Sequence, residues 1–206
     1  MSSQQKSQQT NQDANQSENQ ERTAQIESAV AQLIRALGDD PTRQGLKETP
    51  ARAAKMYAEL FAGIRYTNDE IAAQHGTTFP DPGTQMVLIK DIACFSFCEH
   101  HFALMYNMKA HVAYIPNGLV IGLSKVARIV DLVCKRFQLQ ERIASDIAYI
   151  MEKVLKTPDI MVVIEGEHSC MTARGIRAQG AKTRTHTARG KFEKDNALRM
   201  EVLQHV

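Results

Sequence analysis

The chain has 206 residues, of which 43% are hydrophobic, and its formal net charge is +2 at pH 7. This length allows one domain with a sizeable core, and a charge so close to zero excludes general attraction to nucleic acid or anionic membranes. The sequence has neither an apolar run that could cross a bilayer nor the apolar core of a signal peptide. We therefore predict a cytoplasmic protein, whose four cysteines are metal ligands or buried thiols rather than disulfides.

The N-terminal part of the chain changes character near residue 21. Residues 1–20 contain seven Gln, three Asn and four Ser, so they cannot offset the entropy cost of ordering, and we predict a disordered tail. In residues 21–84 apolar side chains recur at helical spacing, which predicts an N-terminal helical region. Within it, Thr67 and Glu70 have the spacing of a capping box at a helix start.

Residues 85–206 combine strand and helix patterns. Apolar and β-branched runs predict strands over 86–97, 109–115, 160–164 and 182–189. Asn117-Gly118 predicts a hairpin that leads into residues 119–121, and helices are expected from an N-cap at Ser124, from Gln140, and over 194–206. This order fits an α+β domain with antiparallel pairing better than repeated βαβ units.

Two clusters of thiols and imidazoles can share one metal ion. Cys98 and His101 have the Cys-x-x-His spacing that lets a single turn aim a sulfur and a nitrogen at the same ion, and Cys170 is a third ligand. A catalytic zinc site keeps three protein ligands and leaves a position for water. In that interpretation His100 and His168 remain available for proton transfer.

Several alternatives to this catalytic site stay open. The cysteines can be ordinary buried thiols, or Cys94 can complete a closed structural site with four ligands. If a strand continues through His168 and Cys170, their side chains point to opposite faces, so a shared site requires a local bend. Zinc suits a set of two Cys and one His best, although iron or manganese can occupy such ligands.

A cationic helix start indicates an anion site. Ser124, Lys125 and Arg128 fall in the first turns of a predicted helix, where free N–H groups and the helix dipole favour anions. Between Met171 and Lys194 seven Lys or Arg stand against one acid, and Arg174 follows the third thiol by four residues. These residues can hold a polyphosphate close to the metal. The alternatives are a solvated helix face, and a zinc-stapled module that binds nucleic acid through the basic segment.

Gln140 and Glu141 also stand at a helix start. The ordinary interpretation is capping and complementarity to the helix dipole. The functional one is recognition of guanine, because a carboxylate can accept paired hydrogen bonds from the N1 and exocyclic amine of that base. The sequence alone does not distinguish helix capping from guanine recognition.

Together these motifs resemble the GTP cyclohydrolase I family, over nearly everything after Glu21. The likeness rests on Cys98-Glu-His-His-Phe, Val112-Ala-Tyr-Ile-Pro, Val120-Ile-Gly-Leu-Ser-Lys, Gln140-Glu-Arg and His168-x-Cys-Met-x-x-Arg-Gly-Ile-Arg. It implies a tunnelling fold: N-terminal helices, then a catalytic domain over 85–206 whose antiparallel sheet carries helices on one face and joins those of other subunits into a barrel. It also implies a homodecamer with active sites between subunits.

The resemblance further implies zinc-dependent hydrolysis and rearrangement of GTP to 7,8-dihydroneopterin triphosphate with release of formate, the first step of tetrahydrofolate and pterin biosynthesis. An enzyme of the same fold that stops at the opened formamide is the nearest alternative. The segment Ala103–Lys109 departs from the family, because it is slightly longer and lacks the glycine turn usual after the histidine pair.

The resemblance assigns a role to each candidate residue. Zn2+ is expected on Cys98, His101 and Cys170, with His100 and His168 as the catalytic proton-transfer groups. The triphosphate is expected on Lys125, Arg128 and Arg174, the ribose side on Ser124, and guanine on Glu141 with Gln140.

Overall fold

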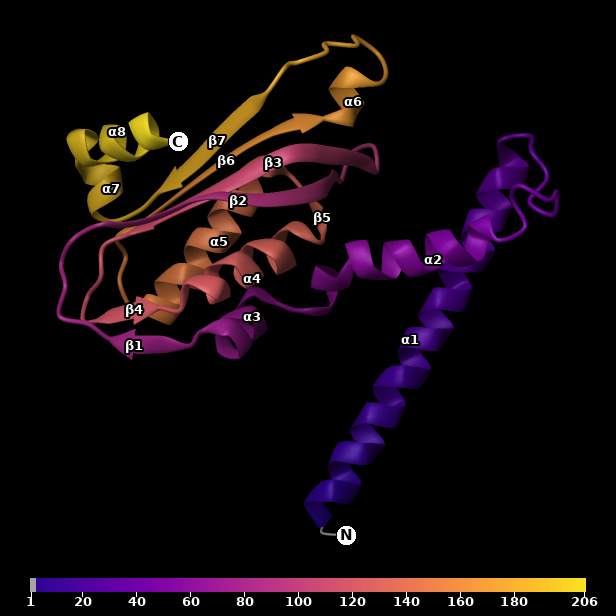
Figure 1. Cartoon of the computed structure of the whole chain (residues 1–206), viewed down its shortest axis with the longest axis horizontal. Helices are drawn as coiled ribbons and strands as arrows, with labels where there is room; N and C mark the ends of the chain where they lie inside the picture. Colours follow the sequence, from indigo (N-terminus) through magenta and orange to yellow (C-terminus); the bar gives the residue numbers. More distant parts are fainter. Residues whose placement is uncertain (1–2) are drawn as a thin grey trace. The chain divides into compact units, whose positions relative to one another are not determined.

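The computed structural model describes residues 3–206, which divide into two compact units, one ending at Phe61 and the other spanning Ala62–Val206 (Figure 1). The first unit contains α1 (Ser3–Ala36) and α2 (Thr49–Leu60), which pack against each other. The boundary between the units lies earlier than the predicted start at residue 85. The reason is that the elements just after Phe61 pack on helices and pair with a strand of the second unit.

Helix α1 begins within the segment that the composition predicts to be a disordered tail. Residues 1–2 lie outside the described residues, but from Ser3 onward the backbone is helical. Gln, Glu and Ala lose little side-chain freedom in a helix, so this polar sequence is compatible with helical backbone. The apolar side of α1 is only partly covered, since Leu33 is 59% exposed, and Leu37, just after the helix ends, is 77% exposed. No helix in residues 3–206 is long and apolar enough to span a membrane.

The second unit is built on a five-stranded sheet with the order β5-β2-β3-β6-β7. Its antiparallel strands are β2 (Val87–Cys98), β3 (Ala103–Tyr114), β6 (Ile160–His168) and β7 (Thr183–Ala188). The two-residue β5 (Phe137–Gln138) lies parallel to the end of β2. The α+β class with antiparallel pairing is therefore confirmed.

Helices cover both faces of this sheet. On one face lie α4 (Leu123–Cys134) and α5 (Gln140–Leu155), whose predicted apolar stripes are buried against β3 and β6 (Figure 1). On the other face, Met161 and Val163 of β6 pack with α7 (Lys191–Lys194) and α8 (Asn196–His205). The prediction of helices on one face holds for α4 and α5 but is wrong for α7 and α8. The prediction fails because β6 carries apolar side chains on both faces of the sheet, so the second face must also be covered.

The prediction of a hairpin at Asn117-Gly118 is wrong, because the strand after this turn does not pair with the strand before it. Gly118 adopts a φ of 78° and turns the chain, but β4 (Leu119–Ile121) pairs with β1 (Thr78–Pro80) in a separate small sheet. A three-residue strand has too few local contacts to fix its partner, so tertiary packing decides.

The helix starts agree with the sequence in one case and differ in another. Before α3 (Asn68–His75), Thr67 and Glu70 form the predicted capping box. For α4 the N-cap is Gly122 rather than Ser124, and no side chain caps the helix. Ser124 is therefore the second helical residue, where its hydroxyl is exposed.

Gly63 lies where two backbones meet. It is in the short 3-10 helix η1 (Ala62–Arg65), and its N–H donates to the Lys135 carbonyl at 3.1 Å. A Cβ there would overlap the carbonyl oxygen of Leu132, which is backbone and cannot rotate away.

Gly63→Ala should therefore lower the free energy of unfolding by about 1–3 kcal/mol, measured by denaturant titration. Gly45→Ala is the matched control, because its Cβ would meet only the flexible Arg43 guanidinium. Equal stability of the two variants would contradict the expectation.

Candidate metal centre

A tight turn between β2 and β3 carries the first two candidate ligands. Cys98 pairs with Ala103, so only four residues connect the strands. Phe102 adopts a φ of 51°, the conformation for which glycine is usual, and its ring packs 5.0 Å from that of Phe137. Glu99 anchors the turn through Arg142, with oxygen to nitrogen distances of 2.7 and 3.2 Å. This ion pair lowers the pKa of Glu99.

The segment Ala103–Lys109, where the sequence predicts a departure from the family, is strand rather than loop. It forms the first half of β3, and its pairing with β6 has a register shift between Tyr106 and Lys109. Asn107, with a φ of 50°, sits at this irregularity and donates to Glu167 at 3.0 Å. A β-bulge of this kind re-aims neighbouring side chains without breaking the sheet.

The third ligand comes from a bend at the end of β6. The strand ends at His168, and α6 (Ser169–Thr172) begins at the next residue. His168 and Cys170 are therefore not held to opposite faces of a strand. The Tyr106 hydroxyl lies 2.9 Å from the Thr172 hydroxyl and ties α6 to β3.

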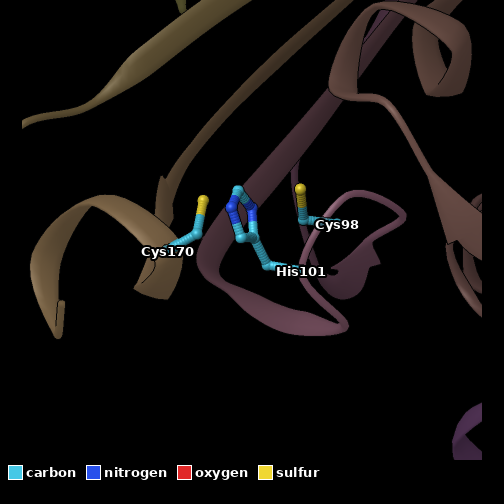
Figure 2. A group of neighbouring side chains, drawn as sticks. All are labelled: Cys98, His101 and Cys170. Carbon is cyan, nitrogen blue, oxygen red and sulfur yellow. The ribbon is translucent and has the colours of Figure 1, made fainter. Parts of the chain in front are cut away.

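These elements bring Cys98, His101 and Cys170 together (Figure 2). One ligand atom from each lies within 4.8 Å of the others, a spacing that suits a single ion bound by all three. Burial and the neighbouring Cys98 thiol raise the pKa of Cys170. A cation bound between neighbouring thiols favours their thiolate forms, so the donor set fits a borderline-soft metal such as zinc.

The closed four-ligand alternative finds no support among residues 3–206. Cys94 is not in the ligand group and instead interacts with Cys134, whose pKa it raises together with burial. His100 is not in the group either. Its exposed ring lies 6.4 Å from that of His101, centroid to centroid, and is nearly perpendicular to it. The geometry leaves three protein ligands with two further imidazoles nearby in the sequence.

His168 is the second candidate proton-transfer group, and its partner is unexpected. Its Nε2 lies 2.8 Å from the side-chain oxygen of Gln140. Burial lowers the pKa of His168, with a smaller opposing effect of Glu141. Burial therefore favours the neutral ring, and the exposed Glu141 carboxylate lies close enough to oppose this effect.

Gln140 does not present its side chain as predicted. It is only 2% exposed, and its amide nitrogen donates to the carbonyls of Ile164 and Thr183 at 3.1 and 2.9 Å. Because both amide hydrogens already have acceptors, the side chain has no donor to offer a base. The predicted guanine contact by the Gln140 side chain therefore does not fit this geometry.

Three of the predicted anion residues, Ser124, Lys125 and Arg128, lie in the N-terminal half of α4, away from the helix end that adjoins the metal group. The C-terminal end of α4 is beside β2, where the Ser96 hydroxyl donates to the Cys134 carbonyl at 2.7 Å. Lys125 stands nine residues earlier, about 14 Å along the axis. Burial, then Lys125 and Arg128, lower the pKa of His75, which indicates a positive field at this end. One copy of the chain thus holds the metal group and these cations apart.

The basic segment after Cys170 is divided among protein partners. Arg189 pairs with Glu152 at 2.6 Å, and Lys182 with Glu165 at 3.5 Å. Lys191 pairs with Asp159, and Arg184 donates to C-terminal carbonyls. Arg174 is exposed, and within the described part of the chain no carboxylate pairs with it. This dispersal weakens the alternative of a nucleic-acid strip.

Comparison with known proteins agrees with the site. The model of the GTP cyclohydrolase I family matches residues 26–206. GTP cyclohydrolase 1 of Clostridium acetobutylicum is 55% identical over 181 residues, which cover 85% of this chain and 93% of that protein. GTP cyclohydrolase 1 of Clostridium botulinum is 56% identical over 176 residues, covering 82% and 90%. A match this long, which includes every residue of the metal group, shows that the chain belongs to the GTP cyclohydrolase I family.

Proposed function

We propose that the chain converts GTP to 7,8-dihydroneopterin triphosphate with release of formate, using zinc held by Cys98, His101 and Cys170. The observation that carries the proposal is the convergence of these three ligand atoms in a chain of this family. Zinc bound there would supply a Lewis acid and activate water near neutral pH. By the family resemblance this reaction opens pterin and tetrahydrofolate biosynthesis, and it is expected in the cytoplasm.

The proposed chemistry needs proton transfer at the guanine ring. Water adds to C8 and the imidazole ring opens to a formamide; a second water releases formate. His168 and His100 are the groups proposed to move protons to and from the ring nitrogens, and a neutral His168 is suited to accept one. The opened ribose then rearranges, and its carbons complete the new ring.

Substrate binding is proposed to use the charged residues around the two ends of α4. Glu141 accepts the N–H groups of guanine, and Ser124 contacts the ribose side. Lys125, Arg128 and Arg174 hold the triphosphate, whose binding energy positions the base for reaction.

A site shared between copies would reconcile these roles with the distances. Lys125 lies about 14 Å along α4 from the end that adjoins the metal group. We therefore propose that the cations of one subunit complete the metal centre of another, in a homo-oligomer that the family resemblance implies to be a decamer.

Product analysis tests the reaction and the metal together. Purified protein incubated with GTP should release formate and, after oxidation, give pterin fluorescence. A chelator should abolish both signals and added zinc should restore them, because the ligands alone supply no Lewis acid. Formate without pterin would indicate arrest after ring opening. Neither product from a zinc-loaded sample would refute the proposed reaction.

A further inference from the structure

The side chain of Gln140 is fixed on three sides inside the second unit. Its amide nitrogen donates to the Ile164 carbonyl of β6 and the Thr183 carbonyl of β7, and the Thr185 hydroxyl lies at 3.4 Å. Carbonyl oxygens only accept hydrogen bonds, so the nitrogen of the amide must face them. If the amide were flipped, its oxygen would meet two carbonyl oxygens in a buried place, which is strongly unfavourable. The orientation of this amide is therefore determined by β6 and β7.

The fixed amide leaves one group to face His168. The Gln140 oxygen lies 2.8 Å from Nε2 of His168, and an amide oxygen can only accept a hydrogen bond. Nε2 must therefore carry the hydrogen in the neutral ring. The lone pair is then on Nδ1, and no other hydrogen bond to this ring is found within residues 3–206.

We propose that Gln140 is a positioning residue, which holds His168 in the Nε2–H tautomer so that Nδ1 is the nitrogen that exchanges a proton with the substrate. The inference rests on the proposed function for its catalytic meaning, but the tautomer itself is a property of the folded chain. It replaces the guanine contact that the sequence predicted for the Gln140 side chain. Locking a catalytic imidazole through a second residue is valuable because the wrong tautomer presents a hydrogen where a lone pair is needed.

The tautomer can be observed directly in the unsubstituted protein. Solid-state 15N NMR of zinc-loaded, histidine-labelled protein at about pH 8.5, where imidazole is neutral, distinguishes the two ring nitrogens. The His168 signal is assigned by its loss in His168→Gln. We expect protonated Nε2 and unprotonated Nδ1. The opposite assignment would overturn the inference whatever the enzyme's activity. Absence of pterin formation by the same sample would instead refute the proposed function.

Substitution separates positioning from substrate contact. Gln140→Met keeps the length of the side chain but neither donates nor accepts strongly, so the ring should populate both tautomers. We expect kcat to fall about 10–100-fold, with KM for GTP changed less than about threefold and the zinc content unchanged. A rise in KM at unchanged kcat would favour a guanine contact and overturn the inference.

The matched control keeps the contact to the imidazole. Thr185→Val removes only the longest of the hydrogen bonds at the amide nitrogen and leaves the Gln140 oxygen in place. Its His168 spectrum and its kcat should match the unsubstituted protein. If Thr185→Val lowered kcat as much as Gln140→Met while the tautomer stayed Nε2–H, general loosening of the site would explain both, and the positioning role would be rejected.

Discussion

Cys170→Ser is expected to lose bound zinc and turnover of GTP together. A serine hydroxyl is a far poorer ligand than a thiolate, and Cys170 is the only thiol among the four residues that form α6. Loss of the metal removes several kcal/mol of transition-state stabilisation, so kcat/KM should fall about a thousandfold or more. Zinc per chain is measured by atomic emission after dialysis, and turnover by formate release.

Cys94→Ala is the control for this substitution. Cys94 lies on the same strand as Cys98 but outside the ligand group, so its removal should leave zinc content and turnover near those of the unsubstituted protein. Stoichiometric zinc and full activity in Cys170→Ser would refute the site. Loss of zinc in Cys94→Ala would support the alternative of a closed structural site in which Cys94 is the fourth ligand.

His168→Ala is expected to keep its zinc but lose most of its ring-opening activity. Removing a general acid or base costs about 100- to 10,000-fold, and the ligand group does not include this imidazole. Single-turnover formation of the opened ring, followed by absorbance, isolates this step from later ones. His205→Ala near the C-terminus is the control, since within residues 3–206 no hydrogen bond to its imidazole is found, and its backbone carbonyl accepts one from Lys90 at 3.3 Å. An unchanged rate in His168→Ala would remove His168 from the chemistry.

The sequence predicted what depends on local pattern. Val126, Ile129 and Val133 recur at helical spacing, and all three are fully buried on α4. The ligand types and the short spacing of Cys98 and His101 predicted a shared metal site, and the turn between two paired strands places both residues in the Cys-His-Cys group.

What the sequence could not predict depends on contacts between distant residues. The partners of the Gln140 amide come from positions 24 and 43 residues further along the chain, so a polar residue at a helix start gave no hint of them. The Glu99–Arg142 pair spans 43 residues and carries no local signal either. The choice of β1 as partner for β4 likewise follows from the packing of the whole unit rather than from the Asn-Gly turn.

The distribution of the three ligands along the chain constrains when the metal can arrive. Cys98 and His101 leave the ribosome together, but Cys170 follows only after α4, α5 and all of β6 have been made. Bringing the distant thiol to the turn requires β3 and β6 to be paired, with Met105 opposite His168. The nascent chain thus offers at most a weak two-ligand site, and the completed sheet creates the third contact. The three-ligand group is therefore complete only once β3 and β6 have paired, so a metal bound by all three residues would stabilise the folded sheet.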